Sequence, residues 1–303
     1  MVHPKILLIG CDGQVGWELQ RTLATFTNVT ATSLCGSYGY ALDLLDAEAV
    51  KTAVASVRLD YIVNAAAHTA VDTAESEIDL SRQLNAEAPE LLAHLAAEVG
   101  AVMVHYSTDF VFSGESSKPY TEDDKTSPLG VYGETKLDGE RRILASDANA
   151  LVFRTSWVYG NHGQNFMKTM LRLFRERDEL SVVNDQIGAP TWSRMIAEAT
   201  AQIILHLHLG IKQINQVKGL YNMTGGGVTS WYGFASQILA LSGESCSLKS
   251  ITTREYPTPA QRPAYSVLDN SKLNQVFMLE LPDWLSSLKR CMEDEGYLNP
   301  TSL

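Results

Sequence analysis

The sequence is short of cysteine, of positive charge and of long apolar runs, and each shortage excludes a class of protein. Its four cysteines are widely spaced and form no CxxC pair, which suits a reducing compartment better than disulfides or a zinc site. The 24 Lys and Arg residues stand against 35 Asp and Glu residues. The resulting net charge of −11 argues against general affinity for nucleic acid or an anionic membrane. The cysteines are Cys11, Cys35, Cys246 and Cys291.

The sequence also lacks the signals that direct a chain to or through a membrane. No apolar run approaches the roughly 18 residues of a transmembrane helix, and Met1–Pro4 shows no signal-peptide pattern. We therefore expect a cytoplasmic protein with no membrane partner. An anionic ligand would need a local positive pocket in so acidic a chain.

Short apolar runs alternate with amphipathic segments in the first half, as in a doubly wound parallel sheet. We predict strands at Lys5–Ile9, Val29–Ser33, Asp60–Asn64, Ala101–Tyr106, Ala150–Arg154 and Leu180–Val183. We predict helices at Trp17–Phe26, Asp46–Val57, Ile78–Val99, Asn165–Glu176, Met195–Leu209 and Pro282–Cys291. The fold class is therefore α/β, a Rossmann sheet in residues 1–157 with a smaller C-terminal α/β substrate-binding domain in 158–303. Part of 180–210 is expected to return to the Rossmann sheet.

A glycine turn follows the first predicted strand. It has the pattern GxxGxxG, formed by Gly10, Gly13 and Gly16 with Gln14 and Val15 between them. Glycines allow the backbone to approach a pyrophosphate, and the helix N-terminus that follows offers free N–H groups. Strand, turn and helix together predict a dinucleotide site, the alternative being a glycine-rich turn without a ligand.

The end of the second predicted strand bears on which dinucleotide is used. A carboxylate there would bind the ribose hydroxyls and disfavour a 2′-phosphate. Ser33 occupies this place, and no acidic residue follows before Asp43. No arginine is found there either, so NADPH and NADH both stay open, and the missing acid favours NADPH or dual use.

The segment VYGETKLDGE, residues 131–140, contains the candidate catalytic pair. Tyr132 and Lys136 stand four residues apart, so a helix would place both side chains on one face. An ammonium beside a phenol lowers the phenol pKa, and moving that pKa from about 10 to near 7 takes roughly 4 kcal/mol. One close cation could supply much of this, helped by an oxidised nicotinamide ring. The pair would then protonate a carbonyl undergoing reduction. By itself the spacing is commonplace on a solvated helix face, so the other motifs have to support it.

Several motifs along the chain resemble the extended short-chain dehydrogenase/reductase superfamily, and within it the dTDP-4-dehydrorhamnose reductase family. The resemblance implies reduction of the C4 ketone of dTDP-4-dehydro-L-rhamnose to dTDP-L-rhamnose by NADPH or NADH. The motifs are GQVGWELQ (Gly13–Gln20), VNAAAHTAVD (Val63–Asp72), HYSTDFVF (His105–Phe112), RTSWVYG (Arg154–Gly160) and YPTPAQRP (Tyr256–Pro263).

The resemblance also implies a role for each matching residue. Tyr132 is the general acid, Lys136 lowers the pKa of Tyr132 and binds the nicotinamide ribose, and Thr108 donates a hydrogen bond to the substrate oxygen. Asp109 and Trp157 match sugar-binding residues, and Arg262 matches an arginine that pairs with the substrate pyrophosphate. Residues implied to hold the cofactor pyrophosphate or line its site are Gly13, Gln14, Val15, Asp43, Leu44, Ala67, His68 and Thr69. For the last five, ordinary loop packing is an equally good explanation.

Two departures from related patterns narrow the expectation. In sugar-nucleotide 4,6-dehydratases of the same superfamily, the expected triplet after the fourth strand is Thr-Asp-Glu. Here Phe110 follows Asp109, and phenylalanine cannot act as a base. Some members of the family bridge a dimer through Mg²⁺ with glutamates. Glu18 matches one such position, but Arg194 falls where another glutamate would stand. We therefore expect Glu18 to be a solvated helix residue and no metal bridge, with a homodimer left open.

Two other functions stay open from the sequence. The regulatory beta subunit of methionine adenosyltransferase shares this fold and a similar YGxTKLDGE segment but is a binding partner rather than a reductase. Trp157 and the HTAVD segment, residues 68–72, point away from it. The other alternative is a reductase of a different 4-keto-6-deoxy sugar nucleotide, since the substrate determinants lie in the irregular C-terminal half.

Overall fold

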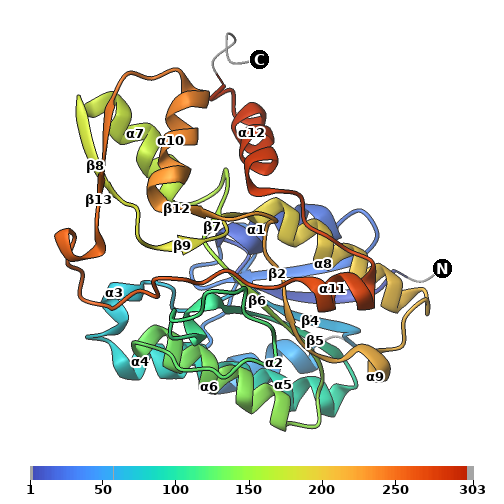
Figure 1. Cartoon of the computed structure of the whole chain (residues 1–303). Coiled ribbons are helices and arrows are strands. Elements are labelled where there is room, and N and C mark those ends of the chain that lie inside the picture. Colours follow the sequence, from blue (N-terminus) through green and yellow to red (C-terminus); the bar gives the residue numbers. More distant parts are fainter. Residues whose placement is uncertain (1–2, 57, 299–303) are drawn as a thin grey trace.

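A seven-stranded parallel sheet forms the centre of the structure, a computed structural model that describes residues 3–56 and 58–298 (Figure 1). The strand order is β11-β6-β5-β4-β1-β2-β3, and every neighbouring pair is parallel. The strands are β1 (Lys5–Ile9), β2 (Asn28–Ser33), β3 (Tyr40–Ala41), β4 (Tyr61–Asn64), β5 (Val102–Thr108), β6 (Asn149–Thr155) and β11 (Gly219–Asn222). The predicted doubly wound parallel sheet is confirmed.

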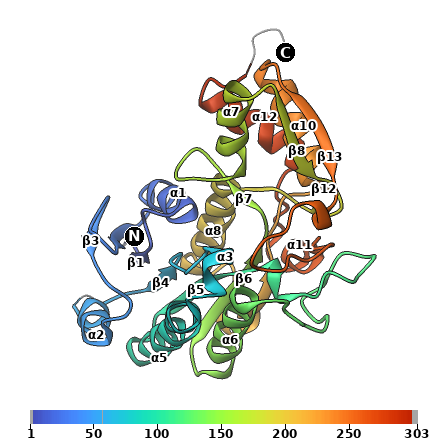
Figure 2. The same ribbon diagram turned by 90° about the vertical axis from the view of Figure 1, so that its left-hand side faces the viewer.

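Helices cover both faces of this sheet (Figure 2). Successive side chains of a strand point to opposite faces, so Leu7 and Ile9 of β1 enter one core while Ile6 and Leu8 enter the other. The first core lies under α2 (Ala47–Ala55), α5 (Ala88–Val99) and α6 (Val131–Ala145). The second lies under α1 (Gln14–Leu23), α8 (Ser193–His208) and α11 (Ser271–Phe277).

A smaller cluster of helices and short strands sits beyond the carboxyl ends of the central strands (Figure 1). Its core surrounds Phe234 and Leu288, both fully buried. The helices are α7 (Phe166–Glu176), α10 (Trp231–Ser242) and α12 (Trp284–Asp294). The strands are β7 (Val158–Tyr159), β8 (Glu179–Val183), β9 (Ile187–Gly188), β10 (Thr191–Trp192), β12 (Thr229–Ser230) and β13 (Ser247–Ile251). The remaining short helices are α3 (Val71–Ala74), α4 (Ile78–Arg82), η1 (Gln83–Glu87), η2 (Asp109–Val111), α9 (Ile214–Val217) and η3 (Thr253–Glu255).

The chain passes between the two halves more than once. After α7 and β8 it returns as α8, which packs on α1, and then supplies β11, which pairs with β6 at the edge of the central sheet. The strands β8, β9 and β10 pair in small sheets of their own. The part of 180–210 that lies on the Rossmann half is thus a helix, and the boundary at residue 157 stays a prediction.

Several predicted element boundaries are corrected by local backbone chemistry. Helix α1 begins at Gln14 rather than Trp17 because Gly13 serves as its N-cap. Helix α12 begins at Trp284 rather than Pro282 because the Asp283 carboxylate accepts hydrogen bonds from the N–H groups of Leu285 and Ser286.

Two further predicted helices and one strand also differ from the structure. The single helix predicted over residues 78–99 is three segments, with a π-helical turn at 83–87. The last residue of the predicted helix Asp46–Val57 lies outside the described residues. Strand β5 extends through Thr108, so this residue ends the strand rather than following it.

Candidate active site

A cleft of about 910 Å³ lies at the carboxyl ends of the central strands. Strands β1 and β4 are neighbours, and the strand order diverges on either side of them. In doubly wound sheets the ligand crevice forms where the order reverses in this way. One wall comes from the loops after β1, β2 and β4, another from β5 and α6, and a third from residues 155–165 with Trp231 and Arg262.

The glycine turn brings β1, β4 and α1 into close contact. Gly10 has a φ of +81°, and a Cβ there would stand 2.7 Å from the backbone nitrogen of Ala66. A Cβ on Gly16 would stand 2.0 Å from the carbonyl oxygen of Gly10. These two glycines are therefore required by the close approach of backbone to backbone, and Gly16 does not line the cleft.

The N-terminus of α1 is free to bind an anion. Its N-cap, Gly13, supplies no side-chain cap, and its first turn contains no acidic residue. The N–H groups of this first turn therefore point past the end of the helix without an intrahelical acceptor. The cleft reaches Gly13, Gln14 and Val15, so the turn fits the pyrophosphate of a dinucleotide.

The segment after β7 closes over this turn. The Asn165 amide donates to Oε1 of Gln14 at 3.1 Å, and the Gln14 amide donates to the Val158 carbonyl at 3.4 Å. The His162 ring stacks on Trp17 with centroids 4.9 Å apart, and its Nε2 lies 2.9 Å from the Asp12 carbonyl. The smaller half thus holds the outer side of the dinucleotide site.

The predicted helix across residues 131–140 is present as the first part of α6, and it places Tyr132 and Lys136 on the cleft wall. Thr108 enters the same wall from the end of β5. Its hydroxyl donates to Oδ1 of Asp109 at 3.1 Å, and the same oxygen is hydrogen-bonded to Tyr132. A phenol, an ammonium and a hydroxyl are therefore gathered where a carbonyl oxygen could meet them.

Lys136 is almost fully buried, with 2% of its surface exposed. Its Nζ donates to the Tyr106 carbonyl at 2.6 Å and lies 3.3 Å from Nε2 of His105. Burial lowers the pKa of Lys136 to about 8, an effect that the charge of Glu140 partly opposes. Burial and the neighbouring ammonium hold the pKa of His105 well below its usual range, so this imidazole is neutral.

The pKa of Tyr132 differs from the sequence expectation. Burial raises it to about 12, and the hydrogen bond with Thr108 opposes this rise only in part. Lys136 is not among the groups that shift it, and its ammonium donates to the Tyr106 carbonyl. With this pKa Tyr132 is a neutral phenol that carries a proton at physiological pH, and the fall toward 7 beside a bound nicotinamide ring stays a prediction.

Unpaired polar atoms of the described residues mark the floor of the cleft. The side-chain oxygens of Ser107 and Thr155, and Oδ2 of Asp109, are buried without a hydrogen-bond partner. Burial also raises the pKa of Asp109 to about 6. Buried polar atoms normally find partners, so the Ser107 and Thr155 oxygens are available to a polar ligand in the cleft.

Two tryptophans form part of the cleft wall. The Trp157 and Trp231 rings stack with centroids 3.6 Å apart and planes 6° from parallel. Trp157 has a φ of +45°, and a Cβ on Gly188 would stand 2.5 Å from its ring, so the loop around it leaves room only for a glycine. The resulting flat surface suits the apolar face of a sugar or a base.

Most of the predicted site residues line the cleft. Those that line the cleft are Gly10, Gly13, Gln14, Val15, Ser33, Asp43, Leu44, Ala67, Thr69, Thr108, Asp109, Tyr132, Lys136, Trp157 and Arg262. His68 does not line it, since its ring binds Ser81 at 2.7 Å and its backbone N–H binds Asn85. The contacts of His68 are therefore those of ordinary loop packing, the alternative given for it in the sequence analysis.

Glu18 is placed differently from the sequence expectation. It is 6% exposed and buried between α1 and α8, not solvated. Burial raises its pKa, and the charges of Arg194 and Arg21 act against that rise. Within residues 3–56 and 58–298, no group of three or more His, Cys, Asp or Glu side chains is arranged to hold a metal ion.

Some cleft residues carry no signal in the sequence. Asn165 and Trp231 belong to the smaller half and reach the site only through the fold of that half. His105 could have been noted, since it stands in the same strand as Thr108, but alternation in a strand does not show that it meets Lys136. The residues missed include Asp12, Leu34, Leu45, Ser107, Thr155, Gly163, Gln164, Asn165 and Trp231.

The profile of the RmlD substrate binding domain family matches residues 4–296 of this chain. The chain belongs to this family. Among its RmlD relatives, the dTDP-4-dehydrorhamnose reductase of Escherichia coli (strain K12) is 47% identical over 300 residues. That match covers 96% of this chain and 97% of the relative. The dTDP-4-dehydrorhamnose reductase of Burkholderia thailandensis is 43% identical over 298 residues, with coverage of 96% and 98%.

Solved structures of dTDP-4-dehydrorhamnose reductases superpose on nearly the whole chain. A dTDP-4-dehydrorhamnose reductase from Clostridium acetobutylicum aligns with a TM-score of 0.88 at 38% identity, covering 96% of this chain and 99% of its own. The Bacillus anthracis enzyme of the same name, solved in complex with NADP, aligns with a TM-score of 0.88 at 31% identity and covers 97% and 100%. Both structures share the fold across both halves and not only the central sheet.

The length and apolar character of a helix decide whether it can span a membrane. Among the residues that the structure describes, none of the helices combines the length and the apolar character needed to cross a bilayer.

Proposed function

We propose that this chain reduces the C4 ketone of dTDP-4-dehydro-L-rhamnose to dTDP-L-rhamnose, with NADPH or NADH as the reductant. One observation carries the proposal: Tyr132, Lys136 and Thr108 stand on one wall of the cleft that begins at the glycine turn. The near full-length likeness to reductases that carry this name supports the choice of reaction.

The residues of the cleft fit a nicotinamide dinucleotide. The α1 N-terminus would hold its pyrophosphate, Ser33 and Asp43 lie toward the adenosine end, and the small residues Ala66 and Ala67 allow close approach beyond β4. When bound in reduced form, this group supplies a hydride to the carbonyl carbon. No arginine or lysine is among the cleft residues near Ser33, which is consistent with the use of either NADPH or NADH.

The chain's own residues supply the proton and hold the charge. Tyr132 is protonated because burial keeps its pKa near 12, so it can donate to an oxygen that becomes far more basic as the carbonyl is reduced. We assign the Lys136 ammonium to a hydrogen bond with the nicotinamide ribose, and Thr108 stabilises the developing oxyanion by a hydrogen bond. Asp109 and Trp157 are assigned to the sugar, and Arg262 to the substrate pyrophosphate.

The test is an assay of NADPH and NADH oxidation with dTDP-4-dehydro-L-rhamnose, with the product identified by mass and stereochemistry. We expect cofactor-dependent formation of dTDP-L-rhamnose. Tight binding of NADPH without oxidation by any 4-keto sugar nucleotide would reject the proposal and favour a non-catalytic binding role.

Two further assignments, of compartment and of oligomeric state, accompany the proposed reaction. We assign the chain to the cytoplasm, where nucleotide sugars are made, and we propose a homodimer that does not depend on Mg²⁺. Light scattering during size-exclusion chromatography, with and without EDTA, measures the second directly.

A further inference from the structure

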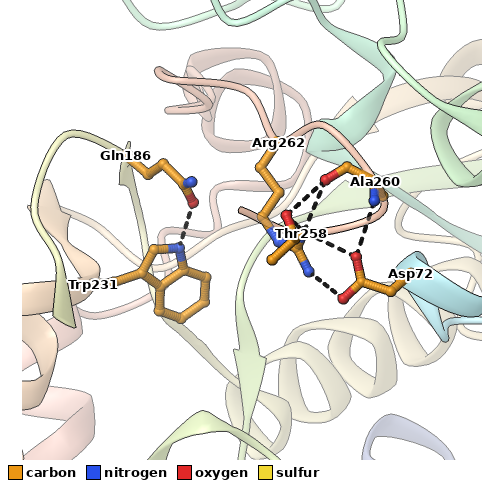
Figure 3. A network of polar contacts seen from close by, with 6 residues as sticks. All are labelled: Asp72, Gln186, Trp231, Thr258, Ala260 and Arg262. Carbon is orange, nitrogen blue, oxygen red and sulfur yellow. Dashed lines mark hydrogen bonds and ion pairs between the residues drawn. The ribbon is translucent and has the colours of Figure 1, made fainter. Parts of the chain in front are cut away.

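Arg262, which lines the cleft, belongs to an ion-paired network between two segments that are far apart in the sequence. Its Nη1 and Nη2 donate to Oδ1 and Oδ2 of Asp72 at 3.1 and 2.8 Å, a bidentate pair. Asp72 lies in α3, after β4, whereas Arg262 lies in the segment 256–263, which follows η3. Figure 3 shows Arg262 between Asp72 on one side and the hydrogen-bonded pair of Trp231 and Gln186 on the other.

The same carboxylate also fixes the backbone that carries Arg262. The Ala260 N–H donates to Oδ1 of Asp72 at 3.1 Å, and Nη1 of Arg262 donates to the Ala260 carbonyl at 2.9 Å and to the Thr258 hydroxyl. The hydrogen bond from Arg262 holds the pKa of Asp72 below its usual range. Asp72 is therefore ionised at neutral pH and anchors both the side chain and its loop.

The donors of Arg262 are not all used. A guanidinium has five N–H groups, and one edge is formed by Nε–H together with the second N–H of Nη2. Within the described chain, neither of these two donors has a protein acceptor, since every bond of Arg262 comes from Nη1 or from the other N–H of Nη2. Arg262 lines the cleft and is partly exposed, at 24% of its side-chain surface.

We propose that Asp72 is a positioning residue for the nucleotide-sugar diphosphate: it holds the end of the Arg262 guanidinium so that the free Nε–Nη2 edge receives two diphosphate oxygens. This rests on the proposed function. A free arginine side chain would lose its rotamer freedom on binding, whereas one already held by a carboxylate binds without that loss. The edge that remains has the geometry of a bidentate phosphate contact.

The principal experiment compares the wild-type enzyme with Asp72→Asn. The substitution keeps the shape of the side chain but removes the charge and one acceptor. We expect KM for dTDP-4-dehydro-L-rhamnose to rise about tenfold, while kcat and KM for NADPH stay within about twofold. Asp79→Asn, which removes one exposed charge from the neighbouring α4, serves as the matched control and should leave all three constants unchanged.

A double-mutant cycle separates positioning from a general loss of charge. In an Arg262→Ala background, Asp72→Asn should raise KM no further, because the carboxylate acts only through the guanidinium. An unchanged or lower KM in Asp72→Asn would overturn the proposal and make Asp72 a competitor of the diphosphate. An equal rise in KM on introducing Asp72→Asn into the wild-type and the Arg262→Ala backgrounds would also overturn it.

A binding measurement keeps the proposal testable apart from turnover. By calorimetry, Asp72→Asn should weaken binding of dTDP about tenfold and leave that of thymidine unchanged. If Asp72→Asn does not fold, Asp72→Glu, which keeps the charge but moves it by one methylene, should show the same selective loss. Wild-type protein that neither binds dTDP nor turns over the keto sugar would reject the proposed function itself, whereas wild-type turnover with an unaffected Asp72→Asn rejects only the positioning role.

Discussion

The Lys136 ammonium is buried, donates to the Tyr106 carbonyl and lies beside the neutral ring of His105, and burial makes its proton less firmly held than in water. Its pKa of about 8 means that the charged form dominates at pH 7 and is lost as the pH rises through 8. A cofactor contact that needs the ammonium must weaken in the same range. The role of Lys136 in binding is therefore visible as a pH dependence.

We predict that the Kd of NADPH is constant between pH 6 and 7.5 and rises above pH 8, by up to about tenfold for each pH unit. Fluorescence titration from pH 6 to 10 measures it. Tyr132→Phe should show the same rise, because the phenol, with its pKa near 12, does not titrate in this range. A flat profile up to pH 10 would contradict an ammonium contact.

Replacing Tyr132 tests the proton donor itself. Tyr132→Phe should lower kcat at least about 100-fold and leave the Kd of NADPH unchanged, since only the transferable proton is lost. Tyr256→Phe, at a tyrosine that is 60% exposed outside the cleft, is the control and should retain full turnover. Wild-type kcat in Tyr132→Phe would remove this residue from the mechanism.

The sequence motifs predicted that these side chains lie in the site, but they did not predict the protonation states. The spacing of Tyr132 and Lys136 in a helix is a local property, so it could be predicted. The distribution of hydrogen bonds around Lys136 depends on β5, which brings the Tyr106 carbonyl and the His105 ring to Nζ. That arrangement is tertiary, as is the burial that raises the pKa of Tyr132 to about 12, so neither could be predicted from the spacing.

At the scale of elements, α6 is held on the sheet by a buried ion pair. Glu140 accepts from Nε and Nη2 of Arg154 on β6 at 2.9 and 2.7 Å, and both side chains are at most 3% exposed. On its other side, Gly139 lets α6 approach the carbonyl of Asn85 in the π-helical turn. The position of the catalytic helix therefore depends on contacts remote from the reacting groups.

We predict that Glu140→Ala lowers the free energy of unfolding by about 3–5 kcal/mol, because it leaves the Arg154 guanidinium buried without its counter-charge. Urea denaturation followed by circular dichroism measures the change. The control is Glu176→Ala in the exposed pair with Arg172, where the loss should stay below about 0.5 kcal/mol. Equal losses in the two variants would show that burial of the first pair is unimportant.

Element boundaries could be predicted where a side chain marks them and not otherwise. Asn165 caps α7, and the predicted Asn165–Glu176 differs from the helix only by including this cap. The π-helical turn at 83–87 has no such mark, because its extra residue is accommodated by contacts of Asn85 with His68 and Thr135. Strand β11 was missed for a similar reason, since only its pairing with β6 makes it a strand.

At the scale of the whole molecule, the cleft is bordered by both halves, so a ligand bound there contacts each of them. We predict that NADPH at 100 times its Kd stabilises the folded state by about 2.7 kcal/mol and raises Tm by roughly 5 °C or more. Differential scanning calorimetry measures the shift.

The control for the Tm shift caused by NADPH is a substitution at the N-terminus of α1. Gly13→Asp adds a good N-cap in a position where a Cβ makes ordinary contact, 3.4 Å from the Gly10 carbonyl oxygen. It should leave the Tm of the free protein unchanged or higher, yet abolish the shift caused by NADPH, since the carboxylate occupies the anion site. A shift equal to that of the wild type would place the pyrophosphate elsewhere.

The edge strand β11 has a consequence for how this protein is made in a cell. Its partner β6 is complete once residue 155 has been synthesised, but the backbone groups on the outer side of β6 wait for residues 219–222. During translation a nearly finished sheet therefore has an open hydrogen-bonding edge for more than sixty residues of further synthesis, the span in which a nascent chain is most exposed to wrong pairing.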